Sequence, residues 1–160
     1  MKLWILLMNM ILEKLTSKIF FRDLLLSLSF LTRIPIFKDL TFERTLMDAA
    51  WSFPLIGALV GFIGGMVAFS LSYLNVSPVI ISLITIGAII LVTGGLHEDG
   101  LADTADGFGS NKRPQDKIRV MRDSRIGVYG TLALMITILM KVNALSELID
   151  NDHISTCVIA

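Results

Sequence analysis

The sequence lacks the features that stabilise small secreted or metal-binding modules. Of its 160 residues only Cys157 is a cysteine, which excludes an intrachain disulfide and a cysteine-based metal site. Net charge is also absent, because 14 Lys and Arg balance 14 Asp and Glu. Without an excess of positive charge the chain has no global field for nucleic acid, and we expect no nucleic-acid partner. The chain is instead rich in apolar residues, which make up 54% of it against 18% charged residues. This composition excludes a disordered chain.

A long stretch without charge determines the fold class. Residues 49–96 include no Asp, Glu, Lys, Arg or His, and a soluble protein of this length has no core large enough to bury them. A membrane-spanning helix needs about 20 apolar residues, and turn residues at 75–78 divide the stretch. We therefore predict spans at 51–74 and 78–96. A third is predicted at 126–145, where Lys141 is close enough to the end to reach the interface.

Basic residues are distributed unevenly around these spans. Seven Lys and Arg precede the first span and six lie in segment 97–125, whereas the 75–78 turn and the tail after Leu145 have none. Short loops rich in Lys and Arg stay on the cytoplasmic side of a membrane. The prediction is a single all-α integral membrane domain with segments 1–48 and 97–125 in the cytoplasm and the tail 146–160 outside.

The N-terminal segment contains two apolar runs, 3–12 and 20–31, each short for a span. A signal peptide is an alternative for the first run, but residues 13–15 offer no small-residue cleavage site. We expect an interfacial or re-entrant helical segment that ends at Ile34, because the residue before Pro35 is biased away from helix.

The first span carries a stripe of glycines. Gly57 and Gly61 form a GxxxG pattern, and Gly64 and Gly65 continue it. Small residues let membrane helices approach closely. We expect this stripe to pack against another helix rather than to contact a substrate.

Residues capable of chemistry are concentrated in segment 97–125. Asp99, Asp103 and Asp106 are spaced i, i+4 and i+7, which on a helix places them within roughly a 60° arc and about 10 Å of axis. Their repulsion would destabilise a helix unless a divalent cation lay between the carboxylates. Oxygen ligands favour Mg²⁺, with Mn²⁺ or Ca²⁺ as alternatives. The alternative interpretation, without a metal, is a solvated helix face beside the membrane. His97 could act as a base, as a hydrogen-bond donor to phosphate or as an interfacial polar residue.

Six cations follow the aspartates between residues 112 and 125. A metal faced by cations suggests a phosphate ligand, because phosphoryl transfer needs positive charge spread over several oxygens. Arg125, at the start of the third span, is the strongest candidate, and Asp123 would add a fourth carboxylate. The alternatives are a headgroup anchor for Arg125, and a helix cap or a salt bridge with Arg119 or Arg122 for Asp123.

Four motifs in order resemble those of the cobalamin synthase family, the adenosylcobinamide-GDP ribazoletransferases. They are FLTRIP at 30–35, FPLIG at 53–57, GGLHEDGLADTADG at 94–107 and MRDSRIG at 121–127, and the resemblance covers about residues 24–148. It implies a magnesium-dependent enzyme of the bacterial inner membrane that acts late in cobalamin biosynthesis. Such an enzyme joins adenosylcobinamide-GDP to α-ribazole or its 5′-phosphate and releases GMP.

The resemblance and the residue pattern together imply a site. The aspartates would hold magnesium on the diphosphate of adenosylcobinamide-GDP, arginines would neutralise its oxygens, and the ribazole hydroxyl would attack. The candidate catalytic residues are Asp103, Asp106 and His97; the candidate phosphate-binding residues are Arg125, Arg33, Ser124 and Arg122; the candidate metal ligands are Asp99, Asp103, Asp106 and Asp123.

Two features depart from the family pattern. Glu98 stands where the family typically has an apolar residue, so a further carboxylate adjoins the site. Family members also continue into a second glycine- and acid-rich motif, and nothing after Leu148 resembles it. We therefore expect the chain to be the N-terminal part of such an enzyme, without its C-terminal half, and the sequence leaves open whether this part is active alone.

Other functions remain open from the sequence. A CDP-alcohol phosphotransferase or a polyprenyl transferase would use the same logic of magnesium on a diphosphate near the bilayer. The former needs an alanine–arginine pair after its second aspartate–glycine, which is absent here. An inactive membrane fragment that binds a partner is the alternative from a different class, and oligomerisation is left open.

Overall fold

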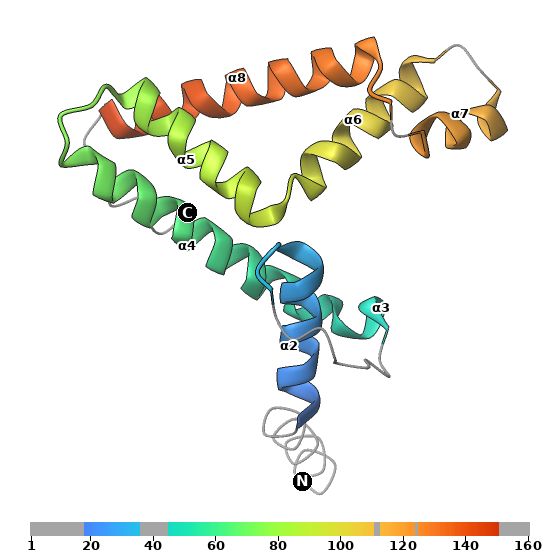
Figure 1. Ribbon diagram of the computed structural model, residues 1–160, viewed down its shortest axis with the longest axis horizontal. Helices are drawn as coiled ribbons and strands as arrows, with labels where there is room; N and C mark the ends of the chain where they lie inside the picture. Colours follow the sequence, from blue (N-terminus) through green and yellow to red (C-terminus); the bar gives the residue numbers. More distant parts are fainter. Residues whose placement is uncertain (1–17, 36–44, 111–112, 124, 151–160) are drawn as a thin grey trace, which may run out of the picture. The chain divides into compact units, whose positions relative to one another are not determined.

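The computed structural model describes residues 18–35, 45–110, 113–123 and 125–150. Within these ranges every regular element is a helix (Figure 1), which confirms the all-α prediction. The chain divides into two units, Met1–Leu59 and Val60–Ala160. The apolar run at 3–12 and most of the tail lie outside the described residues.

Buried polar residues hold the first unit together. It contains α2 (Lys18–Leu31), which ends earlier than the predicted Ile34, followed by the short α3 (Leu46–Ala49) and a 3₁₀ turn, η1 (Ala50–Ser52). The Trp51 indole Nε1 donates to the buried carboxylate of Asp23 at 2.9 Å, and the hydroxyls of Ser27 and Ser52 are hydrogen-bonded at 2.6 Å. These bonds join α2 to η1.

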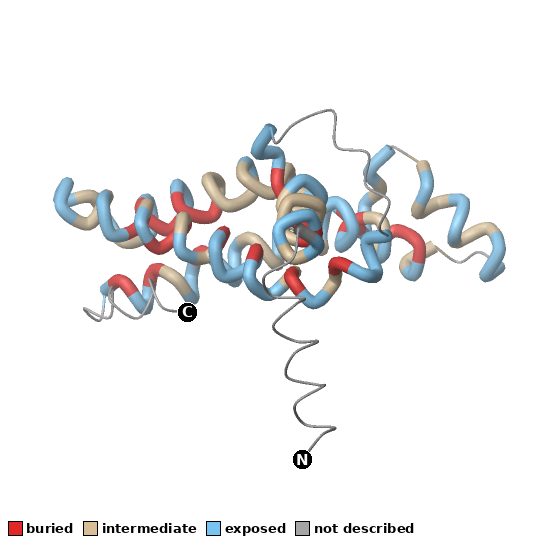
Figure 2. The backbone as a smooth tube through the Cα atoms, turned by 90° about the horizontal axis from the view of Figure 1, so that it is seen from below, coloured by how far each residue is buried: buried red, intermediate tan, exposed pale blue. Residues whose placement is uncertain are grey.

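Among the described residues, two helices are long and apolar enough to cross a membrane. One is the continuous segment Leu46–Ser72, which includes α4 (Phe53–Ser72), and the other is α8 (Val128–Asp150). Only 17% of the apolar window of α8 is buried, and much of its surface is exposed (Figure 2), as expected for a helix that faces lipid. These helices correspond to the predicted spans 51–74 and 126–145, although α8 also includes the first residues of the predicted tail.

The predicted span 78–96 is broken. Helix α5 (Pro78–Thr93) has 16 residues, about 24 Å of helix, which is shorter than a bilayer core of about 30 Å. It ends where Gly94 and Gly95 adopt positive φ angles of 68° and 71°, which favour glycine. Helix α6 (Leu96–Gly109) then leaves at 89° to α5, and the two pass as a span only when taken together. The described part of the chain therefore has two candidate spans, or three if the bent pair is one.

In the second unit α8 packs along both halves of the bent pair (Figure 1). Near its end, Ile149 joins Ile81 of α5 and Ala68 of α4 in a buried apolar cluster. Near its start, Gly130 lies against α6 at Ala102. Thus α5 lies along the later part of α8 and α6 along its earlier part.

The glycine stripe of α4 packs only in part. A Cβ built on Gly64 would lie 2.6 Å from Ile89 of α5, so this glycine allows the close approach that was predicted. A Cβ built on Gly57 or Gly61 would meet no atom of the described residues within 4 Å. The expected helix contact is therefore confirmed at Gly64 and is not seen at Gly57 and Gly61.

Candidate functional site

The three aspartates of the central motif lie on one helix, α6, as predicted. Their environments differ, however. Asp99 is exposed, Asp103 is half-buried and Asp106 is buried, with 9% of its surface exposed. A shared helix therefore does not give the three carboxylates equal access to a ligand.

Asp106 contacts the beginning of α8. Its Oδ2 accepts a hydrogen bond from the backbone N–H of Gly127 at 2.7 Å, and its Oδ1 accepts one from Gly130 at 2.9 Å. These bonds connect residues 21 and 24 positions apart in the sequence. Sequence analysis missed both glycines as site residues, although Gly127 belongs to the MRDSRIG motif.

A hollow of about 480 Å³ lies beside this contact. The end of α6, the segment that follows α7 (Pro114–Met121) and the first turn of α8 line it, and its polar side chains include Asp106, Asp123 and Arg125. Ile126 and Tyr129 form part of its apolar wall. Asp106, Asp123 and Arg125, all three candidate site residues, thus line the same open hollow.

Arg125 is held by Asp123 at the wall of the hollow. The guanidinium Nη2 donates to Asp123 Oδ2 at 2.8 Å, and Nε donates to Oδ1 at 3.2 Å. The hydrogen bonds and the negative charge of Asp123 raise the pKa of Arg125 above its usual value, so the arginine stays charged. Its side chain is 86% exposed and can meet a ligand from solvent.

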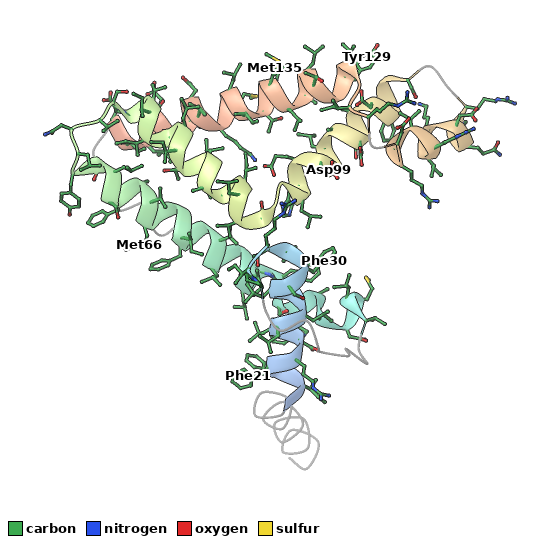
Figure 3. All side chains as sticks on the ribbon, viewed as in Figure 1. Phe21, Phe30, Met66, Asp99, Tyr129 and Met135 are labelled. Atoms are coloured by element: carbon green, nitrogen blue, oxygen red, sulfur yellow. The ribbon has the colours of Figure 1, made fainter. Side chains whose placement is uncertain are left out.

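Other candidate residues lie away from the hollow. His97, Asp99 and Asp103 precede Asp106 on α6, and Figure 3 shows Asp99 on this helix apart from Tyr129, at the start of α8. Arg122 is exposed at the end of α7 and does not line the hollow.

Two predictions and the metal centre stay open. Ser124 lies outside the described residues, and Arg33 belongs to the first unit, so their phosphate contacts stay predictions. Among the residues that the structure describes, no three His, Cys, Asp or Glu side chains form a group that could hold a metal ion. The magnesium site therefore stays a prediction.

Comparison with known proteins decides the family. A profile described as cobalamin-5-phosphate synthase matches residues 23–160. The chain belongs to this family. A relative from Mesorhizobium japonicum, named adenosylcobinamide-GDP ribazoletransferase, is 44% identical over 129 residues, which are 80% of this chain and 49% of the relative. One of the same name from Shewanella amazonensis is 46% identical over 125 residues, 78% of this chain and 48% of the relative.

The chain spans about half the length of the curated relatives it matches. No solved structure matches it significantly. Membership in the cobalamin-5-phosphate synthase family confirms the resemblance drawn from the four motifs, and together with the apolar helices it shows that the chain is a membrane protein.

Glu98, the residue that departs from the family pattern, forms an ion pair with another helix. Lys141, past the middle of α8, places its Nζ 3.0 Å from Glu98 Oε1 on α6, and the Glu98 side chain is only 16% exposed. Charged residues within membrane helices are commonly paired in this way. The prediction was that Lys141 reaches the membrane interface. In the structure it instead joins α8 to α6, the helix that carries the aspartates, in this member of the cobalamin-5-phosphate synthase family.

Proposed function

We propose that this chain takes part in the reaction for which its relatives are named, adenosylcobinamide-GDP ribazole transfer. The adenosylcobinamide phosphate moiety passes to a hydroxyl of α-ribazole or its 5′-phosphate. A new P–O bond forms to that hydroxyl oxygen, the P–O bond to GMP breaks, and GMP leaves. The single observation that carries the proposal is the hollow beside the aspartate helix, which holds an exposed arginine fixed by a carboxylate.

Arg125 suits a phosphate ligand. Its Nε and Nη2 donate to Asp123, whereas its Nη1 makes no hydrogen bond within the described part of the chain. An arginine with free donors and a fixed orientation is well suited to phosphate oxygens, which it contacts with good geometric specificity. We assign it to the diphosphate of adenosylcobinamide-GDP.

Asp99 and Asp103 fit a magnesium ion better than Asp106 does. They lie one turn apart on α6, and neither carboxylate accepts a hydrogen bond recorded among the described residues. Magnesium at phosphate sites is usually bound by one or two carboxylates, together with waters and substrate oxygens. When bound, it would supply positive charge to the diphosphate and orient it.

The remaining roles follow from position. His97, in the first turn of α6, or the carboxylate of Asp103 would accept the proton of the attacking hydroxyl. The concentration of Lys and Arg before the first span and in segment 97–125 favours the cytoplasmic face of a bacterial inner membrane for this site.

The experiment is an assay of GMP release by the purified chain in detergent, with adenosylcobinamide-GDP, α-ribazole and Mg²⁺. Asp103→Asn should abolish magnesium-dependent release, because it removes a carboxylate without changing the shape of the side chain. Asp116→Asn on α7 is the matched control and should retain release, since Asp116 is half-exposed, forms an ion pair with Arg113 and does not line the hollow. Full activity of Asp103→Asn would contradict the assignment.

A further inference from the structure

The first turn of α8 cannot cap itself. Gly127 directly precedes the helix and has no side chain, and the first backbone N–H groups of any helix lack partners within it. In most helices a Ser, Thr, Asp or Asn at this position accepts those hydrogen bonds. Here the acceptor must come from another part of the chain.

Asp106 of α6 supplies it. One carboxylate oxygen accepts from the residue before the helix, Gly127, and the other accepts from Gly130 in the first turn. In a capping box two separate side chains share this task, whereas here a single carboxylate from another helix performs it. Its negative charge also lies at the positive end of the helix dipole, which is favourable.

The packing around the carboxylate is close. A Cβ added to Gly127 or to Gly130 would overlap the carboxylate of Asp106, so both positions require glycine for this contact. At Gly100, on the same helix as Asp106, an added Cβ would meet nothing within 4 Å. Glycine at 127 and 130 is therefore matched to Asp106.

We infer that Asp106 is a positioning residue that fixes the start of α8, and with it the segment bearing Asp123 and Arg125, and that it is not a magnesium ligand. Both of its oxygens already accept charge-assisted hydrogen bonds in a buried site. Gly127 is two residues from Arg125, so loss of the contact would loosen the arginine at the hollow. The link to catalysis rests on the proposed function, whereas the contact itself does not.

Amide hydrogen exchange at Gly127 tests the contact without an activity assay. Its N–H has no other acceptor recorded among the described residues, so its protection reports on Asp106. In the wild-type chain, labelled with ¹⁵N-glycine and studied by NMR in micelles, we expect exchange at least about tenfold slower than in an unstructured peptide. Exchange as fast as in such a peptide would overturn the inference, and this measurement needs no variant to fold.

Substitutions then separate positioning from metal binding. Asp106→Asn keeps the size of the side chain but leaves one acceptor oxygen, which can serve Gly127 or Gly130 but not both, so exchange at one of these two glycines should rise about tenfold or more. Gly130→Ala should also raise exchange at Gly127, because the added methyl group overlaps the carboxylate of Asp106. Asp103→Asn and Gly100→Ala should leave exchange at Gly127 unchanged. Unchanged protection at both Gly127 and Gly130 in Asp106→Asn would contradict the assignment.

Magnesium titration of GMP release gives the second readout. Asp99→Asn should raise the Mg²⁺ concentration needed for half-maximal release, whereas Asp106→Asn should lower the maximal rate and leave that concentration within about twofold. A rise in Asp106→Asn equal to that in Asp99→Asn would make Asp106 a ligand. If the wild-type chain releases no GMP, the proposed function fails for this chain, and the exchange data still decide whether Asp106 fixes α8.

Discussion

Asp99, Asp103 and Asp106 show what spacing can and cannot establish. The i, i+4, i+7 pattern correctly predicts that they share a helix. It treats them as equivalent, however, and the structure makes them different, because α8 covers Asp106 and leaves Asp99 exposed. The partner of Asp106 lies 24 positions away, and no local periodicity contains that information.

Arg125→Lys tests the proposed phosphate contact. Lysine keeps the positive charge but lacks the planar fork that contacts both Asp123 and a phosphate. We expect the Kd for adenosylcobinamide-GDP, measured by calorimetry in detergent, to rise about tenfold. The thermal midpoint should change little, because exposed ion pairs contribute little to stability.

The control for this substitution is Arg113→Lys, since Arg113 is 88% exposed and pairs with Asp116 outside the hollow. Its Kd should match that of the wild type. Equal affinity in Arg125→Lys and Arg113→Lys would remove Arg125 from the phosphate site.

Among the helices, composition predicts the unbroken spans and misses the broken one. Hydropathy over 51–74 and 126–145 locates α4 and α8, because lipid exposure is a local property of a segment. The uncharged stretch continues through Gly94 and Gly95, so charge alone does not reveal the bend. The adjacent glycines 94 and 95 are the sequence feature that could have indicated the bend, since both adopt positive φ between α5 and α6.

The Glu98–Lys141 pair should stabilise the packing of α6 on α8. Lys141→Met leaves a carboxylate that is 16% exposed without its cation, and we expect a loss of about 1–2 kcal/mol in the free energy of unfolding. The loss should be smaller than for a fully buried pair, because Lys141 is 49% exposed. Unfolding by SDS in mixed micelles measures it.

Replacing both partners separates the pair from the side chains themselves. Glu98→Leu combined with Lys141→Leu removes both charges, so the double variant should be close to wild type in stability. A double variant no more stable than the single ones would show that the two side chains act independently.

The second unit as a whole indicates that α5 and α6 together cross the membrane rather than return to the same side. Ile81, near the start of α5, packs with Ile149 at the end of α8, whereas Ala102 of α6 lies beside Gly130 at its start. With 23 residues α8 is about 34 Å long, enough to cross a bilayer core of about 30 Å. The two ends of the bent pair therefore lie toward opposite ends of a helix that crosses the bilayer.

This arrangement predicts opposite accessibility for two positions. In a chain with Cys157→Ser, Ser77→Cys lies in the turn before α5 and Gln115→Cys lies on α7, after α6. A membrane-impermeant maleimide added to intact cells should label position 77, and position 115 only after permeabilisation, because the basic residues of segment 97–125 favour the cytoplasmic side. Labelling of both positions in intact cells would indicate a re-entrant pair. Labelling of position 115 alone would reverse the orientation and place the aspartates of α6 outside, away from a cytoplasmic nucleotide substrate.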